Sequence, residues 1–503
     1  MILTIAAYLI FMVAIGVYFT KKNNSAGDFY LGGRTLGPLV TAMSAEASDM
    51  SSWLLMGLPG VAYLSGIASP GWTAIGLALG TYFNWLIVAK RIRRYTVVAG
   101  DSITLPDFFK NRFRDNGNAM LLIAALIIIV FFVPYTASGF AACGKLFASL
   151  FGTDYLTAMI ISAAVIVLYT TLGGFLAASM TDLIQSIIMT VALIAVLAFG
   201  VIHAGGFDAV VANAQSLSGY FSLFTSYDAA SGTAVGYDFL TIASTLAWGL
   251  GYFGMPHILL RFMAIKDEKK LTLSRRVASV WVVISMAVAI FIGVIGNAMS
   301  AAGALPNLAD SETVIVNIAR LMSENGILLA IVAGVILAGI LAATMSTADS
   351  QLLAASSSVS ENIFKSVFKV KLDEKKTMLV ARLTVVVIAI IGVLLALNPE
   401  SSVFGIVSFA WAGFGASFGP VVLFSLFWKR TNKYGALAGM ITGGIMVFVW
   451  KFLISPLGGA WGIYELLPAF LLASAVIAVV SLITPAPSKE VVDDFMKVKA
   501  MGK

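Results

Sequence analysis

Long apolar stretches separated by short polar segments follow one another along nearly the whole chain. A helix that crosses a bilayer needs about 20 consecutive apolar residues. By that measure the pattern predicts about thirteen membrane-spanning helices, at residues 2–20, 38–65, 70–89, 118–149, 156–176, 181–204, 237–258, 277–302, 326–357, 379–397, 402–428, 434–454 and 462–484. The division is least marked where the fifth and sixth stretches adjoin. The pattern therefore predicts an all-α polytopic membrane protein.

Composition agrees with this class. The 503 residues are 59% hydrophobic and 11% charged, whereas soluble globular proteins carry about 25% charged residues. The single cysteine, Cys143, excludes an intrachain disulfide framework.

Basic residues fall on alternate loops. With the N-terminus placed outside, the inner loops contain all of the 32 Lys and Arg residues except Lys145, Arg320 and Lys451. The positive-inside rule then predicts an N-out, C-in orientation. The same bias accounts for the net charge of +7, so no nucleic-acid partner is expected.

Two carboxylates lie deep in the span 38–65, within the sequence SAEASDMSSWLLMG. An ionised side chain at mid-bilayer costs roughly 2.5–3.5 kcal/mol on insertion scales, so Glu46 and Asp49 are expected to serve a site. Serines crowd the span and a GLPG motif follows, which predicts a helix broken at membrane depth, where freed backbone groups line a cavity. Two other acids, Asp182 and Asp349, fall near predicted inner ends, where water is expected to reach them.

A second interrupted span, 237–258, ends in WGLGYFGMPHILLRF. Its glycines and proline predict a second break. Where the segment is helical, Trp248, Tyr252 and Pro256 share one face. Aromatic side chains beside closely approaching backbone suit a small ligand.

The two interrupted spans each begin a block of five predicted helices. An odd number of helices inverts the second block relative to the first, as in alternating-access transporters with a site near the midplane. The division predicts one transporter domain, 1–484, and a short cytoplasmic tail, 485–503, with no domain of its own. Within the domain lie repeat one at about 38–204, repeat two at about 237–428, and peripheral helices 2–20, 434–454 and 462–484.

A third polar group occurs in the sequence LAATMSTADSQ of span 326–357. Ala343, Ser346 and Thr347 are spaced i, i+3 and i+4, on one helical face. Their carbonyl and hydroxyl oxygens suit a small alkali cation, by analogy with other hard cations. The alternative is that both hydroxyls bond to their own helix.

Several stretches together resemble the sodium/solute symporter family, in particular its sodium/proline symporters. They are LGGRTLGPLVTAMSAEASDMSSWLLMGLPG, ITLPDFF, GGFLAASMTD, WGLGYFGMPHILLRFMA, AATMST, NPES, AWAGFGASFGPVVLFSLFWKR and GALAGM. The resemblance implies a leucine-transporter-like fold with a five-plus-five inverted-repeat core, one extra N-terminal helix and two further C-terminal helices. It also implies a bacterial inner membrane.

The resemblance implies residue roles as well. Sodium ligands would be the backbone carbonyls of Ala47 and Met50, together with Ala343, Ser346 and Thr347. Residues at the proline site would be Ser51, Ser52, Trp53, Tyr135, Trp248, Tyr252 and Pro256. Residues tied to coupling or transport would be Asp49, Arg34 and Asp182.

Two positions depart from the resemblance: the proline symporters have glycine in place of Glu46, and commonly in place of Ser52. Like charges as close as Glu46 and Asp49 disfavour joint ionisation. Glu46 is therefore expected either to be neutral or to turn toward another helix, and we group it with the coupling residues.

The expected function is import of L-proline with Na⁺ by alternating access, without an organic cofactor. The alternative is a Na⁺- or H⁺-coupled symporter of another small solute, such as a different amino acid, a betaine-like osmolyte or an organic anion. An enzyme is not expected, because the two histidines lie far apart and form no nucleophile–base pair or metal cluster with the one cysteine.

Overall fold

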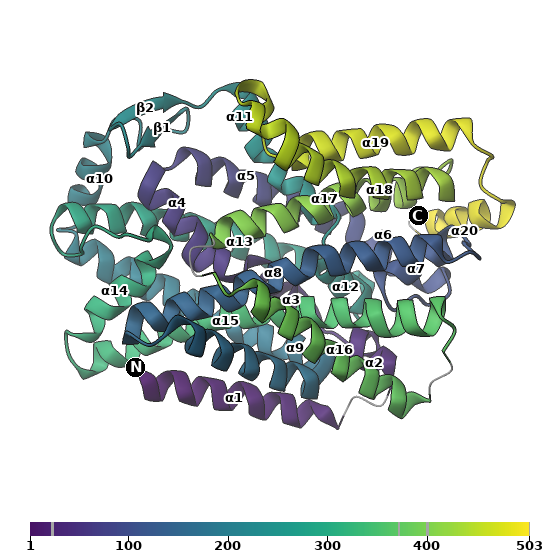
Figure 1. Ribbon diagram of the computed structural model, residues 1–503, viewed down its shortest axis with the longest axis horizontal. Helices are drawn as coiled ribbons and strands as arrows, with labels where there is room; N and C mark the ends of the chain where they lie inside the picture. Colours follow the sequence, from purple (N-terminus) through teal and green to yellow (C-terminus); the bar gives the residue numbers. More distant parts are fainter. Residues whose placement is uncertain (22–24, 371–372, 399–401, 502–503) are drawn as a thin grey trace.

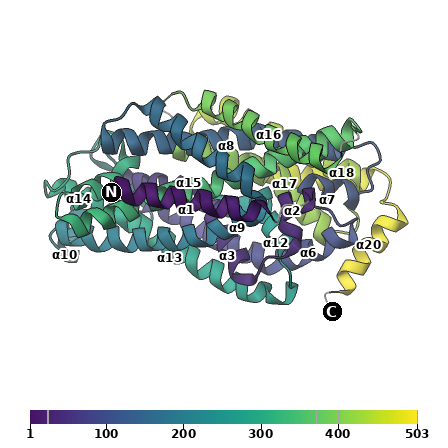
Figure 2. The ribbon, with the colours of Figure 1, turned by 90° about the horizontal axis from the view of Figure 1, so that it is seen from below.

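The computed structural model describes residues 1–21, 25–370, 373–398 and 402–501, and it is almost entirely helical. Long helices lie roughly side by side along the longest axis, and the two termini lie at opposite ends of that axis (Figures 1 and 2). In the described parts, 10 helices are long and apolar enough to cross a membrane. The prediction of an all-α polytopic protein is confirmed.

The first half of the chain forms ten helices. They are α1 (Ile2–Thr20), α2 (Ala26–Leu31), α3 (Pro38–Ser52), α4 (Leu58–Ser65), α5 (Ala68–Phe83), α6 (Ala89–Val98), α7 (Leu105–Arg112), α8 (Ala119–Phe151), α9 (Tyr155–His203) and α10 (Phe207–Ser216). A short hairpin follows, formed by β1 (Thr225–Asp228) and β2 (Thr233–Gly236).

The second half forms ten more. They are α11 (Phe239–Leu246), α12 (Pro256–Ala264), α13 (Leu271–Ala301), α14 (Val314–Ser323), α15 (Ile327–Ser357), α16 (Glu374–Leu395), α17 (Val403–Phe427), α18 (Lys433–Val449), α19 (Leu466–Ile483) and α20 (Lys489–Ala500). Shorter helical turns occupy Gly32–Arg34, Trp53–Gly57, Asn84–Val88, Ala247–Phe253, Glu268–Lys270, Ser311–Thr313, Ser358–Val367, Trp450–Ile454, Ser455–Leu457 and Gly459–Gly462.

Side-chain caps fix where several helices begin. Thr104, Asp154 and Asn432 each accept a hydrogen bond from a backbone N–H of the first turn, before α7, α9 and α18 respectively. Such caps satisfy amides that have no partner inside the helix.

Helix α9 contains the pair of adjoining apolar stretches. Its 49 residues are interrupted at Gly174, where φ is 61° and ψ is −161°. An unbroken helix of that length would measure about 74 Å, more than twice the hydrocarbon thickness of about 30 Å. Each half is long enough for one crossing.

The connections between helices at the end of the bundle that holds the N-terminus contain short helices and a hairpin. Helix α10 and the hairpin lie between α9 and α11, and α14 precedes α15; all of them lie at the end of the molecule that holds the N-terminus (Figure 1). The apolar pattern does not predict the hairpin, which lies between two predicted spans. The resembling motif NPES includes residues 399–401, which lie outside the described residues.

The C-terminal tail folds into α20 at the opposite end. Val491, Phe495 and Val498 are buried along one face of this helix. Arg114, after α7, pairs with Glu490 at 3.2 Å and with Asp494 at 2.9 Å. The described part of the tail therefore contains a helix that packs against the bundle.

Glycines allow the backbone of α5 to lie in direct contact with the backbone of the turn Ala247–Phe253. A Cβ atom added at Gly80 would lie closer than 3.0 Å to the Gly249 backbone, and one at Gly249 would meet the Gly76 carbonyl. Small residues permit this kind of approach between membrane helices.

We predict that Gly80→Ala lowers thermal stability, because the added methyl must push two backbones apart, and overpacking costs about 1–3 kcal/mol. The measurement is the Tm of the purified protein in detergent. Gly236→Ala is the matched control, since nothing lies within 4 Å of that position. Equal Tm values for the two variants would contradict the prediction.

Candidate functional site

The predicted break in the first interrupted span lies at Ser51. Its φ of 49° and ψ of −170° interrupt α3, and such a positive φ is uncommon for a residue other than glycine. Ser51 Oγ accepts a hydrogen bond of 3.0 Å from the backbone N–H of Trp53. The chain then continues through Trp53–Gly57 into α4. The helix is therefore broken beside the two acids, as predicted.

The second predicted break separates α11 from α12. The tight turn Ala247–Phe253 carries Trp248 and Tyr252, and Pro256 occupies the first turn of α12. Proline is favoured there because its missing N–H has no partner in a helix start. Pro256 therefore begins the second half of the broken helix and does not continue the face of the two aromatic residues.

Asp49 connects both broken segments. Its Oδ2 accepts a 2.5 Å hydrogen bond from the Tyr252 hydroxyl, and its backbone carbonyl accepts one of 3.4 Å from the Tyr135 hydroxyl of α8. Only 6% of Asp49 is exposed. A change in either broken segment must therefore move or break a contact of this residue.

A small cavity lies beside Asp49. Its volume is about 10 Å³, roughly the space of one water molecule. The lining residues are Asp49, Met50, Trp53, Leu77, Tyr135, Trp248, Val407 and Trp411. Five of them were candidate site residues from the sequence; Leu77, Val407 and Trp411 were not. Ser52 is buried next to the cavity, and no described residue bonds to its hydroxyl.

Three aromatic rings, which we call the aromatic lid, close one side of the cavity. Ring centroids lie 5.6 Å apart for Trp53 and Trp248, 5.5 Å for Trp248 and Phe404, and 6.1 Å for Trp53 and Phe404. Trp53 and Trp248 line the cavity, whereas Trp248 and Phe404 line a second cavity of about 500 Å³, which we call the vestibule. Trp248 therefore stands between the two cavities.

Phe404 is held by contacts that no local sequence pattern predicts. Glu312 accepts hydrogen bonds from the backbone N–H of Phe404 at 3.1 Å and from the Ser402 hydroxyl at 3.2 Å. Lys145 pairs with the same carboxylate at 3.0 Å. The segment before α14 thus anchors the start of α17 and with it one ring of the lid.

The predicted cation ligands of α15 face α3. Ser346 Oγ lies 2.8 Å from the Ala47 carbonyl and 3.1 Å from the Ala343 carbonyl. Thr347 Oγ1 lies 3.2 Å from the Ala343 carbonyl. The hydroxyls therefore bond to their own helix, as the alternative stated, and Ser346 also reaches the broken helix. No contact places the Met50 carbonyl with this group; Met50 lines the cavity.

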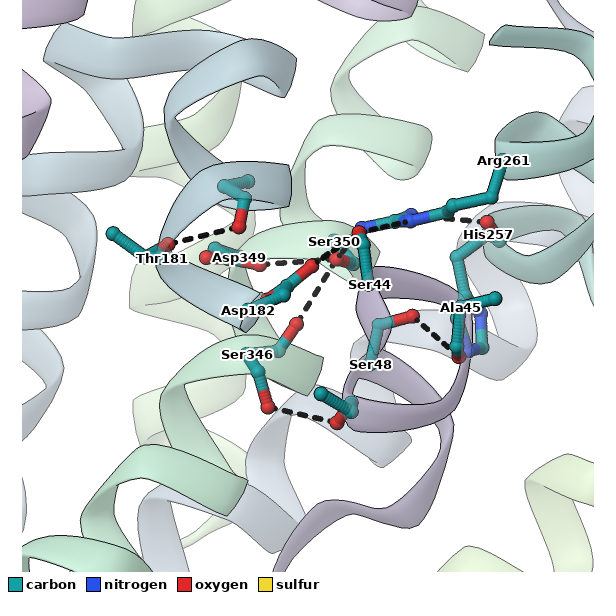
Figure 3. Close-up of polar contacts among 12 residues, drawn as sticks. Ser44, Ala45, Ser48, Thr181, Asp182, His257, Arg261, Ser346, Asp349 and Ser350 are labelled. Atoms are coloured by element: carbon teal, nitrogen blue, oxygen red, sulfur yellow. Dashed lines mark hydrogen bonds and ion pairs between the residues drawn. The ribbon is translucent and has the colours of Figure 1, made fainter. Parts of the chain in front are cut away.

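A buried polar cluster lies beyond Ser346 (Figure 3). Arg261 of α12 contacts Asp182 Oδ2 of α9 at 3.2 Å and Ser350 Oγ of α15 at 2.5 Å. Ser44 of α3 accepts from Arg261 at 3.0 Å and donates to Asp182 at 2.6 Å. The cluster therefore connects both broken helices to α9 and α15.

The second carboxylate of the cluster is Asp349. It accepts from the Tyr169 hydroxyl at 2.6 Å and from Ser350 at 3.0 Å. Asp182 and Asp349 are both 0% exposed, so the expectation that water reaches them was wrong. The charge pattern groups Arg261 with the inner loops; its place in the apolar run HILLRFMA is the signal that marks it as a buried residue.

Arg34 lies outside the cavity. Its guanidinium donates to the Met263 carbonyl at 2.6 Å, the Ser102 carbonyl at 2.9 Å and Asp101 at 3.1 Å. Nearby, the backbone N–H of Leu36 bonds to the Ala264 carbonyl at 3.2 Å. Arg34 therefore holds the start of α3 against the end of α12.

Glu46 turns toward another helix, which is the second of its two expected arrangements. Its Oε1 accepts from the Thr81 hydroxyl at 3.0 Å and from Trp85 Nε1 at 2.9 Å. Glu46 thus contacts α5 and the turn that follows it.

Two broken helices that meet beside a small cavity are typical of secondary transporters. Residues 29–443 match the sodium:solute symporter family, and the chain belongs to that family. It is a multi-pass protein of the cell membrane.

Curated relatives cover nearly the whole chain. It is 42% identical over 488 residues to the osmoregulated proline transporter OpuE of Bacillus subtilis (strain 168), covering 97% of this chain and 96% of that protein. It is also 42% identical to sodium/proline symporter 2 of Staphylococcus saprophyticus, covering 99% and 96%. Among solved structures, a Na⁺-coupled sialic acid symporter has the same fold, with a TM-score of 0.79, 18% identity and coverage of 97% and 98%.

We predict that Arg261→Met strongly destabilises the protein, because it leaves Asp182 and Asp349 buried without a cation. Removing one partner of a buried pair costs about 3–5 kcal/mol. The measurement is Tm in detergent. Arg320→Met is the matched control, since its pair with Glu324 is exposed and worth at most about 1 kcal/mol. Equal effects of the two substitutions would contradict this role.

Proposed function

We propose that this protein imports L-proline together with Na⁺ by alternating access. The observation that carries the proposal is the 42% identity, over 97% of the chain, to a proline transporter. The geometry supports it, because an aromatic-walled cavity adjoins a group of carbonyl and hydroxyl oxygens. The transport cycle requires no covalent chemistry and no organic cofactor.

The proposed topology has thirteen crossings, N-out and C-in. Dividing α9 at Gly174 and adding the two broken helices to the 10 long apolar helices gives this number. An odd number agrees with termini at opposite ends of the bundle (Figure 1). The proposed division keeps one transporter domain, 1–484, with inverted repeats at about 38–204 and 237–428, peripheral helices 2–20, 434–454 and 462–484, and the tail 485–503.

Sodium is proposed to bind between α3 and α15. Its ligands are the carbonyl oxygens of Ala47, Met50 and Ala343 and the hydroxyls of Ser346 and Thr347. The 2.8 Å approach of Ser346 to the Ala47 carbonyl supports this set, because it places oxygens of both helices together. Binding there favours one relative position of the broken helix and α15.

Proline is proposed to bind in the cavity under the aromatic lid. Its carboxylate takes the amides freed near Ser51, Ser52 and Trp53, since the start of a helix attracts anions. Its ring lies against Tyr135, Trp248 and Tyr252, while Pro256 shapes the break. The cavity of about 10 Å³ must widen, so binding requires Trp53 and Trp248 to move.

Coupling is proposed to act through Asp49, which contacts both broken segments. Arg34 and Asp182 hold the same helices together toward the C-terminal end of the bundle, and Glu46 braces α3 against α5. Sodium and proline then favour the same arrangement of the broken helices, which is linkage between two ligands.

The sodium gradient supplies enough free energy. One Na⁺ moving through 100 mV yields about 2.3 kcal/mol, and a tenfold concentration gradient adds about 1.4 kcal/mol. Together these support a proline gradient of several hundredfold at one-to-one coupling.

The test is uptake of labelled proline by proteoliposomes. We expect an inward Na⁺ gradient to drive accumulation and a proton gradient alone to fail. Unlabelled proline should compete, whereas another amino acid, a betaine-like osmolyte or an organic anion should not. Uptake that ignores sodium, or that responds to protons in wild type but not in Glu46→Gln, would support the alternative coupling and refute this proposal.

Ser346→Ala is expected to raise the Na⁺ concentration for half-maximal uptake by about 10-fold or more, since a hydrogen bond to a charged group is worth about 1.5–3 kcal/mol. Ser356→Ala is the control: Ser356 lies on the same helix but bonds to Tyr30 and the Ala381 carbonyl. An unchanged sodium response in Ser346→Ala would remove Ser346 from the proposed ligands.

Trp248→Ala and Asp49→Asn are expected to affect different constants. Trp248→Ala removes a wall of the cavity and should raise the KM for proline by about 10-fold, equivalent to about 1.4 kcal/mol. Asp49→Asn should chiefly weaken the dependence of uptake on sodium. The roles would be wrong if Trp248→Ala altered only the sodium response or Asp49→Asn left it unchanged.

A further inference from the structure

A groove of about 490 Å³ lies between α9 and α13 on the surface of the bundle. We call it the α9–α13 groove; its walls are mainly apolar. The side chains of Ile194, Val280 and Ile284 line it, and each is more than half exposed. Met43 of the broken helix α3 also lines it. The groove therefore opens toward the hydrocarbon and reaches the helix that carries the proposed binding site.

The groove has the length of one leaflet. Its α13 residues run from Arg276 to Val288, which at 1.5 Å per residue is about 18 Å of helix. Half of a hydrocarbon core about 30 Å thick is about 15 Å. An acyl chain lying along the groove would therefore remain at its natural depth.

An arginine side chain lies at one end of the groove. Arg276 is exposed, one to two turns after the start of α13, and among the described residues its guanidinium has no ion pair or hydrogen bond. In the proposed orientation this end faces the cytoplasm, and Lys269, Lys270 and Arg275 lie next to it in sequence. Basic groups at the cytoplasmic end of a pocket between membrane helices favour an anionic headgroup.

We propose that the α9–α13 groove binds an anionic phospholipid, with an acyl chain along the groove and the phosphate on Arg276. Trp281 Nε1 donates to Thr190 Oγ1 at 2.9 Å, which fixes the indole as a wall of the groove and ties α13 to α9. The assignment of the leaflet rests on the proposed orientation. The groove therefore lies where the broken helix α3 meets α9 and α13, the two helices that Trp281 ties together.

The test uses the full chain in phosphatidylcholine vesicles that contain a minor fraction of lipid with brominated acyl chains. Bromine quenches tryptophan fluorescence on contact, and the Trp281 contribution is the difference between wild type and Trp281→Phe. We expect brominated phosphatidylglycerol to quench this contribution with roughly fivefold higher apparent affinity than brominated phosphatidylcholine, as one arginine–headgroup contact near the surface predicts. The readout requires neither sodium nor proline, so it is independent of the transport test.

Arg276→Gln keeps all 9 tryptophans and should make the two lipids quench equally, whereas Arg276→Lys should retain the preference. Lys433→Gln is the matched control. It also removes one positive charge on the proposed cytoplasmic side of the membrane, but at the start of α18, away from the groove. Equal quenching by both lipids in wild type would leave an acyl-chain contact without headgroup recognition and overturn the proposal. Absence of any Trp281 contribution, or the same preference in wild type and Arg276→Gln, would overturn it as well.

Discussion

The backbone break at Ser51 is the constraint on which the rest of the site depends. Inside a bilayer, N–H and C=O groups that leave a helix must be surrounded by protein or by a water-filled cavity. Here the neighbours meet that need: Ser51 bonds to the Trp53 amide, Ser346 reaches the Ala47 carbonyl, and Tyr135 reaches the Asp49 carbonyl. The groups that satisfy the broken helix thus include residues of the proposed ion and solute sites.

Closure at both ends follows from the two clusters around this break. Toward the vestibule, the aromatic lid is held by packing and by the anchor at Glu312. Toward the C-terminal end, charge pairing at Arg261 and backbone bonding at Leu36 join the two broken helices. The two closures differ in chemistry: the lid is apolar ring packing, whereas separating a buried ion pair leaves a buried charge without its partner, which is costly.

The sequence predicted the elements well and the contacts between them poorly, for physical reasons. Spanning helices follow from apolar length, and the break at Ser51 follows from acids and serines within one local stretch. By contrast, the Arg261 cluster joins four helices, and the Glu312 anchor joins α8 to the start of α17. No local pattern relates residues so far apart. Met50 and Pro256 illustrate the limit: Met50 lines the small cavity and Pro256 begins α12, and neither position follows from the local sequence alone.

Helix α20, near the C-terminus, packs against helices from the first half of the chain. Phe495 lies beneath the guanidinium groups of Arg91 and Arg112, at 5.1 and 5.7 Å from the ring centroid, and Arg91 belongs to α6. The 12-residue helix therefore packs against α6 and α7, which lie far from it in the chain. A fluorophore attached to α20 would report the position of α6, and a chain cut before Lys489 would take one aromatic contact from each of the two arginines, which keep their contacts with Phe427 and Tyr95.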